Sequence, residues 1–156
     1  AIALFSGFIF MKRYMAILAV VVTMLLTDYF AFGFLSPEWF ASKSMWVVYL
    51  SLLFPIVFKN FLQKKLGFLR IAGAALASST VFFLATNFAV WAFSPMYQKT
   101  WSGLVLCYTM AIPFFQNTVA GDLIWSGVIF GIYYTLCSYS NLTVLKQKNS
   151  LIYSSN

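Results

Sequence analysis

Polar side chains concentrate in one segment of this sequence, residues 111–125 (AIPFFQNTVAGDLIW). Pro113 lies near its start, and the polar side chains that follow within nine residues are Gln116, Asn117, Thr118 and Asp122. A proline cannot donate a backbone hydrogen bond and disfavours helix at the residue before it, so we expect a helix to start or kink here. Polar groups are costly in hydrocarbon, so these side chains should face a cavity, a partner or water. The segment is therefore the first candidate for a binding site.

The residue types that usually perform enzyme chemistry are scarce. There is no histidine, which removes the commonest general base and the usual ligand of zinc and haem. Cys107 and Cys137 lack CxxC spacing and lie in or beside apolar runs, so we expect two free thiols. Asp28 and Asp122 lie on segments that need not meet, and no phosphate-binding GxxxxGK[ST] loop is present. We therefore expect no enzyme activity, no metal and no cofactor, although the two aspartates leave a proton-coupled carrier conceivable.

Composition indicates an all-α integral membrane protein. Of 156 residues, 62% are hydrophobic and only 8% are charged, whereas soluble domains carry about 25% charged residues. The net charge is +7, but the basic residues lie mostly between apolar runs. We interpret them as orientation signals and contacts to lipid headgroups, and we expect no nucleic-acid partner.

Apolar runs divide the chain into expected membrane helices. Residues 2–11 are too short to cross a core of about 30 Å unless their helix begins upstream. The other expected crossings are residues 15–35, 45–58, 71–93 and 118–139. Pro55 is expected to kink the third of these five runs. We divide the chain into a transmembrane domain over residues 1–139 and a polar tail over 140–156.

Residues 101–115 are ambiguous, because they fit a short crossing or a helix lying in the membrane interface. If they cross, the side with the basic stretch 59–70 holds six positive charges against four. If they do not cross, the tail joins that side and the balance becomes eight against two. The positive-inside rule favours the second arrangement. We therefore expect about five crossings plus one short interfacial or re-entrant helix, with the basic loops and the tail cytoplasmic.

Small and polar residues inside the apolar runs suggest packing and binding surfaces. Asn87 and Trp91 are four residues apart and share a helix face, and Asn87 fits an interhelical hydrogen bond as well as a ligand contact. Asp28, near the end of its run, fits a snorkelling or helix-capping acid as well as a substrate or partner contact. Small residues that allow close approach of another helix are Gly73, Ala77, Gly121, Gly127 and Gly131.

Three tracts resemble the substrate-binding S components of energy-coupling factor transporters. FIFMKR followed by a helix ending TDYFAFGF is similar to their second and third helices, TNFAVWAFSPMY to the end of the fifth, and AIPFFQNTVAGDL to the start of the sixth. The patterns TNFAVW, CYTMAIPFFQNT and GDL are more similar still to a family of small uncharacterised bacterial membrane proteins. The chain departs from the S components in two ways: it lacks their first helix, which docks the coupling subunit, and it has Asp122 where a lysine often follows the asparagine.

The resemblance implies a membrane-embedded binding component for a vitamin-like or heterocyclic solute, in a bacterial cytoplasmic membrane. Candidate ligand contacts are Asn87, Trp91, Tyr97, Tyr108, Phe114, Gln116, Asn117 and Asp122, in which aromatic rings stack on a flat ligand and amides orient it. The alternative is a non-catalytic accessory subunit, packed through its small residues against other integral membrane subunits. Membrane lipid is an expected partner in both cases.

Overall fold

The computed structural model describes residues 1–10, 12–32, 43–64 and 66–154, with side chains over the same ranges except 31–32 and 141–154. All regular secondary structure in these ranges is helical, which confirms the expected all-α class. The helices in chain order are α1 (Ile2–Ile9), α2 (Arg13–Phe32), α4 (Lys43–Leu53), the 3-10 helix η1 (Phe54–Phe58), α5 (Lys59–Lys64), α6 (Phe68–Phe93) and α7 (Trp101–Ser154).

Four segments of the described chain are long and apolar enough to cross a membrane. They are Arg13–Phe30, Lys43–Lys64, Phe68–Phe93 and Trp101–Ser140. These four match expected crossings and are consistent with a multi-pass membrane protein, whereas a fifth crossing remains a prediction. The run that was expected to supply it forms α1, whose 8 residues extend only about 12 Å.

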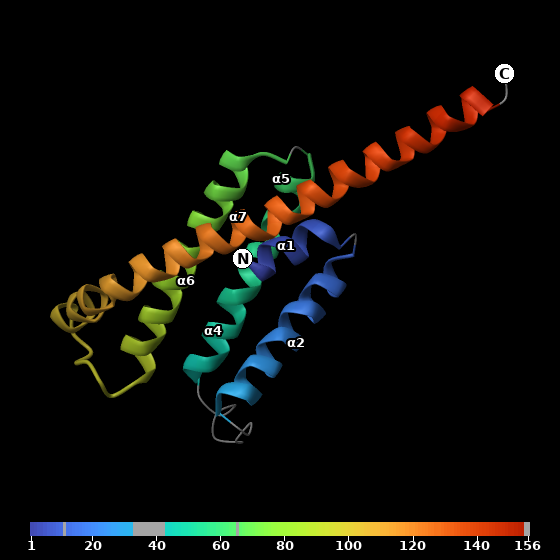
Figure 1. Ribbon diagram of the computed structural model, residues 1–156. Coiled ribbons are helices and arrows are strands. Elements are labelled where there is room, and N and C mark those ends of the chain that lie inside the picture. The colour runs from blue at the N-terminus through green and yellow to red at the C-terminus, as the bar shows by residue number, and fades with distance from the viewer. Residues whose placement is uncertain (11, 33–42, 65, 155–156) are drawn as a thin grey trace.

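The short helix α1 lies inside the bundle rather than at its edge (Figure 1). Leu4 belongs to a core cluster with Leu62 of α5 and Phe130 of α7. Ala3 belongs to a second cluster with Ala16 of α2. Leu4 and Ala3 therefore place α1 in both clusters, so this helix packs against α2 and α5 as well as against α7.

Proline interrupts the second span as expected. Regular α-helix ends at Leu53, Pro55 lies in the first turn of η1, and α-helix resumes at Lys59. The missing N–H and the ring of Pro55 disfavour an α-helical hydrogen bond at this point, and the tighter 3-10 turn accommodates it.

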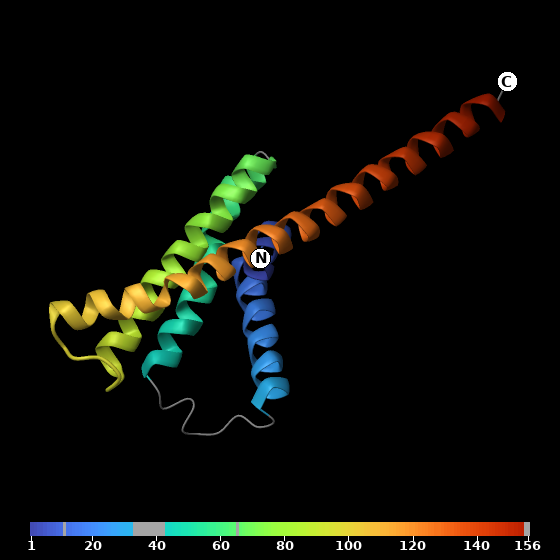
Figure 2. The same cartoon turned by 60° about the vertical axis from the view of Figure 1, so that its left-hand side comes forward.

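The second helix breaker, Pro113, behaves differently. It lies within α7, which runs as one helix of 54 residues. The structure therefore shows no separate helix over residues 101–115, and most of the expected tail, residues 140–154, continues the same helix. The axis of α7 changes direction between its yellow start and its orange middle (Figures 1 and 2), as expected for an internal proline. An interfacial position for the part before Pro113 remains a prediction.

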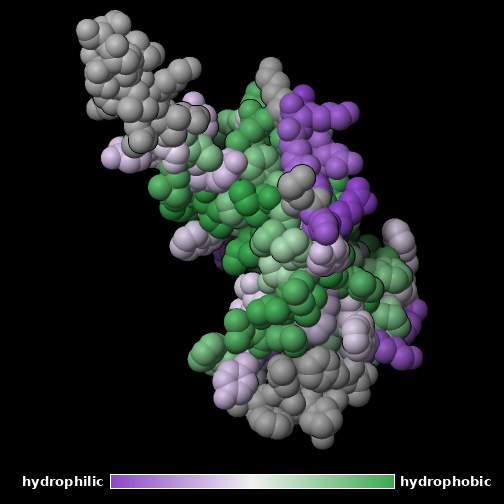
Figure 3. Space-filling model, turned by 90° about the vertical axis from the view of Figure 1, so that its right-hand side faces the viewer, coloured by the Kyte–Doolittle hydropathy of each residue, from purple (hydrophilic) through white to green (hydrophobic). Residues whose placement is uncertain are grey.

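The outer surface suits a lipid environment. Large apolar side chains are exposed on every long helix, among them Leu18 on α2, Leu50 on α4, Leu84 on α6 and Ile124 on α7. The side view in Figure 3 shows hydrophobic residues over its middle and most of the hydrophilic ones gathered toward one end. This distribution is the reverse of a soluble protein's and agrees with the composition.

Gly7 marks the closest approach between α1 and η1. A β-carbon added at Gly7 would lie 3.1 Å from the Cα atom of Ile56, whereas one added at Gly73 of α6 would meet nothing within 4 Å. We predict that Gly7→Val destabilises the protein by about 1–3 kcal/mol through overpacking. Thermal unfolding in detergent measures this, with Gly73→Val as the matched control. Equal unfolding midpoints for the two variants would contradict the close packing of α1.

Candidate functional site

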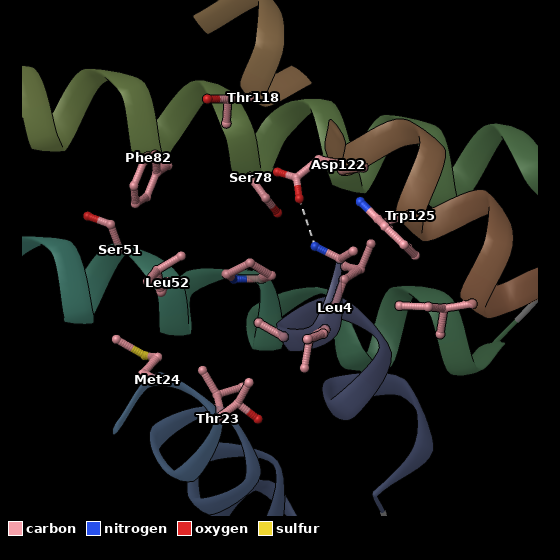
Figure 4. A pocket seen from close by; sticks show the side chains of 17 residues that line it. Leu4, Thr23, Met24, Ser51, Leu52, Ser78, Phe82, Thr118, Asp122 and Trp125 are labelled. Carbon is pink, nitrogen blue, oxygen red and sulfur yellow. Dashed lines mark hydrogen bonds and ion pairs between the residues drawn. The ribbon is translucent and has the colours of Figure 1, made fainter. Parts of the chain in front are cut away.

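A cavity of about 670 Å³ lies at the centre of the bundle and takes wall residues from α1, α2, α4, η1, α6 and α7. Its volume falls in the range of small-molecule sites, about 300–1,000 Å³. The walls are mainly apolar, with side chains such as Leu4, Met24, Leu52 and Phe82. Figure 4 shows these side chains converging from several helices on one space.

Among the residues that line the cavity, Asp122 is the one that carries a carboxylate. Its Oδ2 atom accepts a hydrogen bond of 2.7 Å from the hydroxyl of Ser79 on α6, which also lies within 3.1 Å of the carbonyl oxygen of Ala75. The start of α1 lies beside the other oxygen, because Oδ1 is 2.7 Å from the nitrogen atom of Ala1. Ser79 is 1% exposed and Asp122 is 28% exposed, so the carboxylate is bound at its base and open on the cavity side. In Figure 4 it points into the space between the helices, with Ser78 beside it.

Helical spacing explains how α7 and α6 face this cavity. Thr118, Asp122 and Trp125 follow one another at intervals of four and three residues and line the cavity together. Ala75, Ser78 and Phe82 do the same on α6, at intervals of three and four. Residues at these intervals lie on one helix face, so each helix presents a single stripe to the cavity.

Four hydroxyls in the cavity wall share one arrangement. Each donates its proton to the backbone carbonyl four residues earlier in its own helix. The donors and acceptors are Thr23 to Ala19 (2.8 Å), Ser51 to Val47 (2.7 Å), Ser78 to Ala74 (2.7 Å) and Thr118 to Phe114 (3.0 Å). Toward the cavity, these hydroxyls therefore present oxygen lone pairs.

The predicted contacts Asn87, Phe114 and Tyr108 lie elsewhere on the α6–α7 interface. Asn87 and Phe114 line a smaller cavity of about 220 Å³, and Tyr108 lines another of about 350 Å³. The Asn87 amide donates to the carbonyl of Phe83 in its own helix at 2.8 Å. The Tyr108 hydroxyl donates to the carbonyl of Leu84 at 2.7 Å and so links α7 to α6. The small cavity adjoins the central one, because Phe82 and Thr118 line both.

The four remaining predicted contacts lie outside these three cavities. Gln116 and Asn117 are exposed on α7. Trp91 is half-buried near the end of α6, and its indole N–H donates to the carbonyl of Gln98 at 2.9 Å. Tyr97 is half-buried in the connection that follows α6. The structure thus places Asp122, out of the eight predicted contacts, at the central cavity.

Comparison with known proteins assigns the chain to a family. Its residues 1–145 match the model described as "Family of unknown function (DUF6580)". The chain belongs to this family. No curated protein and no solved structure is detectably similar to it.

Asp28 of this DUF6580 protein has a partner on a neighbouring helix. Its carboxylate accepts a hydrogen bond of 2.5 Å from the hydroxyl of Tyr49 on α4. Asp28 is absent from the central cavity wall, so the two aspartates serve different places in the bundle. The two cysteines, Cys107 and Cys137, are free as expected.

The predicted packing glycines are open in this family member. A β-carbon at Gly73, Gly121, Gly127 or Gly131 would meet nothing within 4 Å. Gly127 and Gly131 line a groove of about 530 Å³ between α6 and α7. No described residue of this chain therefore uses them for close helix packing, and their contact with another subunit remains a prediction.

Sequence reasoning missed the serine that bonds to Asp122 and three of the four hydroxyls in the cavity wall. Ser78 and Ser79 directly follow Gly73 and Ala77, which were interpreted as packing residues. Thr23 and Ser51 lie singly inside apolar runs. Helical spacing from Asp122 gives the wall residues of α7 alone, namely Thr118, Trp125 and Ile129, and it carries no signal for the hydroxyls on the other helices.

We predict that Ser79→Ala destabilises the protein by about 1.5–3 kcal/mol, because it removes a hydrogen bond to a charged group. Ser78→Ala is the matched control, since that hydroxyl bonds only to the backbone of its own helix and its loss should be nearly neutral. Thermal unfolding of both variants in detergent measures the difference. A Ser78→Ala variant that unfolds as early as Ser79→Ala would show that the Ser79–Asp122 bond contributes nothing specific.

Proposed function

We propose that this protein is the membrane-embedded binding component of an uptake system for a small solute, vitamin-like or heterocyclic. The central cavity around Asp122 is the observation that carries the proposal. Its volume is about 670 Å³, and its apolar walls surround a few converging polar groups, as in typical ligand sites. An ionisable side chain inside a transmembrane bundle is costly, and such residues commonly mark substrate or ion pathways.

The resemblance to S components of energy-coupling factor transporters supports the same role. In that interpretation the chain binds the solute without enzyme activity, and a separate module supplies the energy. The ligand would lie in the central cavity, with Phe82 and Trp125 as its aromatic walls, rather than beside Gln116 and Asn117, which are exposed.

The charge distribution supports a cytoplasmic position for one end of the bundle. Helix connectivity brings the α1–α2 turn, α5 and the start of α6 to one end, which carries Lys12, Arg13, Lys59, Lys64 and Arg70. The start of α4 and the α6–α7 connection, at the other end, carry Lys43 and Lys99. The positive-inside rule assigns the first end to the cytoplasm, and the resemblance makes the membrane a bacterial inner membrane.

The alternative, an accessory subunit in a larger complex, is favoured by the open glycine face. Gly127 and Gly131 line the α6–α7 groove, and a β-carbon added at either would meet nothing within 4 Å. Small residues of this kind allow close approach of a transmembrane helix. In this alternative, Asp122 would have a structural role through Ser79.

Native mass spectrometry of the full chain, gently extracted from its own host membrane, tests the proposal. We predict a retained small molecule that Thr118→Phe abolishes, because the larger side chain fills part of the cavity. Thr135→Phe is the matched control: its hydroxyl makes the same type of backbone bond on α7, but its side chain is exposed and lines none of the cavities described.

Thermal unfolding must show that both variants are folded. A small molecule retained equally by both would place its site outside the cavity. Recovery only as a stoichiometric member of a larger assembly, with no small molecule, would favour the accessory subunit.

A further inference from the structure

We propose that the central cavity selects a small organic cation: a protonated amine, or a similar group rich in hydrogen-bond donors, on an apolar or aromatic body. The inference rests on the proposed function and names its substrate class. It follows from the balance of donors and acceptors in the cavity wall.

The wall presents acceptors almost throughout. The hydroxyls of Thr23, Ser51, Ser78 and Thr118 each have one proton, and each proton is bonded to a backbone carbonyl of the same helix. A hydroxyl with its proton engaged offers only lone pairs to a ligand. A ligand that lacks donors would leave these oxygens without partners after their water is removed, which is unfavourable.

The one charged side chain in the wall is also an acceptor. Ser79 donates one hydrogen bond to Asp122, and the nitrogen atom of Ala1 lies 2.7 Å from Oδ1. A carboxylate offers about four lone-pair positions, so positions are left for a ligand. No lysine or arginine side chain lines the cavity in the described part of the chain, so an anionic ligand would face Asp122 without a compensating side chain.

Aromatic walls complete the selection for a cation. Phe82 and Trp125 line the cavity, and Figure 4 shows Trp125 to one side of Asp122 and Phe82 to the other. Ring faces attract cations and pack against flat apolar groups. The wall has one further side-chain donor, the indole N–H of Trp125, and none of the hydrogen bonds described above uses its proton. A charged head against Asp122 and an apolar body between the rings therefore fit this site.

Three probes of similar size and different charge test the inference: phenethylammonium, phenethyl alcohol and phenylacetate. Isothermal titration of the detergent-purified full chain should show binding of the ammonium probe and at least tenfold weaker binding of the other two. Asp122→Asn, which is isosteric and neutral, should weaken the ammonium probe by about 10- to 100-fold, the factor associated with a hydrogen bond to a charged group. Asp122→Glu should retain part of the binding.

Asp28→Asn is the matched control, because it removes a carboxylate that bonds to Tyr49 and does not line the cavity. It should leave the affinity for phenethylammonium unchanged. Equal affinities for the three probes, binding of none of them, or an Asp122→Asn variant that binds as the unmodified chain does would each overturn the cation assignment.

The native ligand separates this inference from the function on which it rests. A neutral or anionic molecule retained by the native protein and lost in Thr118→Phe would overturn the cation while the uptake role stands. A retained molecule with a positive charge, lost in Asp122→Asn, would support both. The absence of any retained molecule together with no probe binding would remove both.

Discussion

The hydrogen bond between Ser79 and Asp122 fixes the centre of this bundle. A carboxylate inside a membrane protein has to be satisfied by other protein groups, because the hydrocarbon offers none. Ser79 supplies one donor from α6, and the nitrogen atom of Ala1, just before α1, lies 2.7 Å from the other carboxylate oxygen. Three segments far apart in the chain therefore meet at one residue of α7. The central cavity lies where these segments meet, next to the same carboxylate.

The two faces of α7 have different surroundings, and their composition explains the difference. The face with Thr118, Asp122 and Trp125 meets the mixed polar and aromatic wall of the central cavity. The face with Gly127, Phe130 and Gly131 meets the first part of α6, where Phe130 reaches the core and Leu123 packs against it. Phe130 lies 5.3 Å from Phe5 and 5.4 Å from Phe8, measured between ring centroids, and so anchors α1. The glycines beside it leave an open groove, and this groove is the feature on which a helix of a partner subunit could pack.

Hydropathy alone predicted the four long spans, because a segment of about 20 apolar residues has few alternatives to a membrane helix. Sequence reasoning also located the interruption at Pro55. At Pro113 it left a helix start and a kink open, and the structure shows the kink, because α7 is bonded to α6 both before and after this residue.

The site was predicted in part. Asp122 was identified because a carboxylate is unusual in an apolar run, but Gln116 and Asn117 were grouped with it by proximity in sequence. All three residues lie on α7, but on different faces: Gln116 and Asn117 are exposed, and Asp122 lines the cavity. Ser79 could not be paired with Asp122 from sequence, because the register between α6 and α7 depends on contacts across 43 residues.

The position of Asp122 along the bundle can be measured on two helices, α7 and α6. On α7 it follows Pro113 by nine residues, or about 14 Å along the axis. On α6 its partner Ser79 lies about 17 Å from the first residue, Phe68, and about 21 Å from the last, Phe93. The distance from Pro113 is close to half of a hydrocarbon core of about 30 Å, and Ser79 lies near the middle of its own helix. A carboxylate near the middle of a crossing helix is at the position where its charge is most costly. A second carboxylate, Asp28, lies near the end of its own span, where water is closer. The contrast favours a ligand-binding role for Asp122 over a purely structural one, because a neutral residue bonded to Ser79 would hold the helices at lower cost.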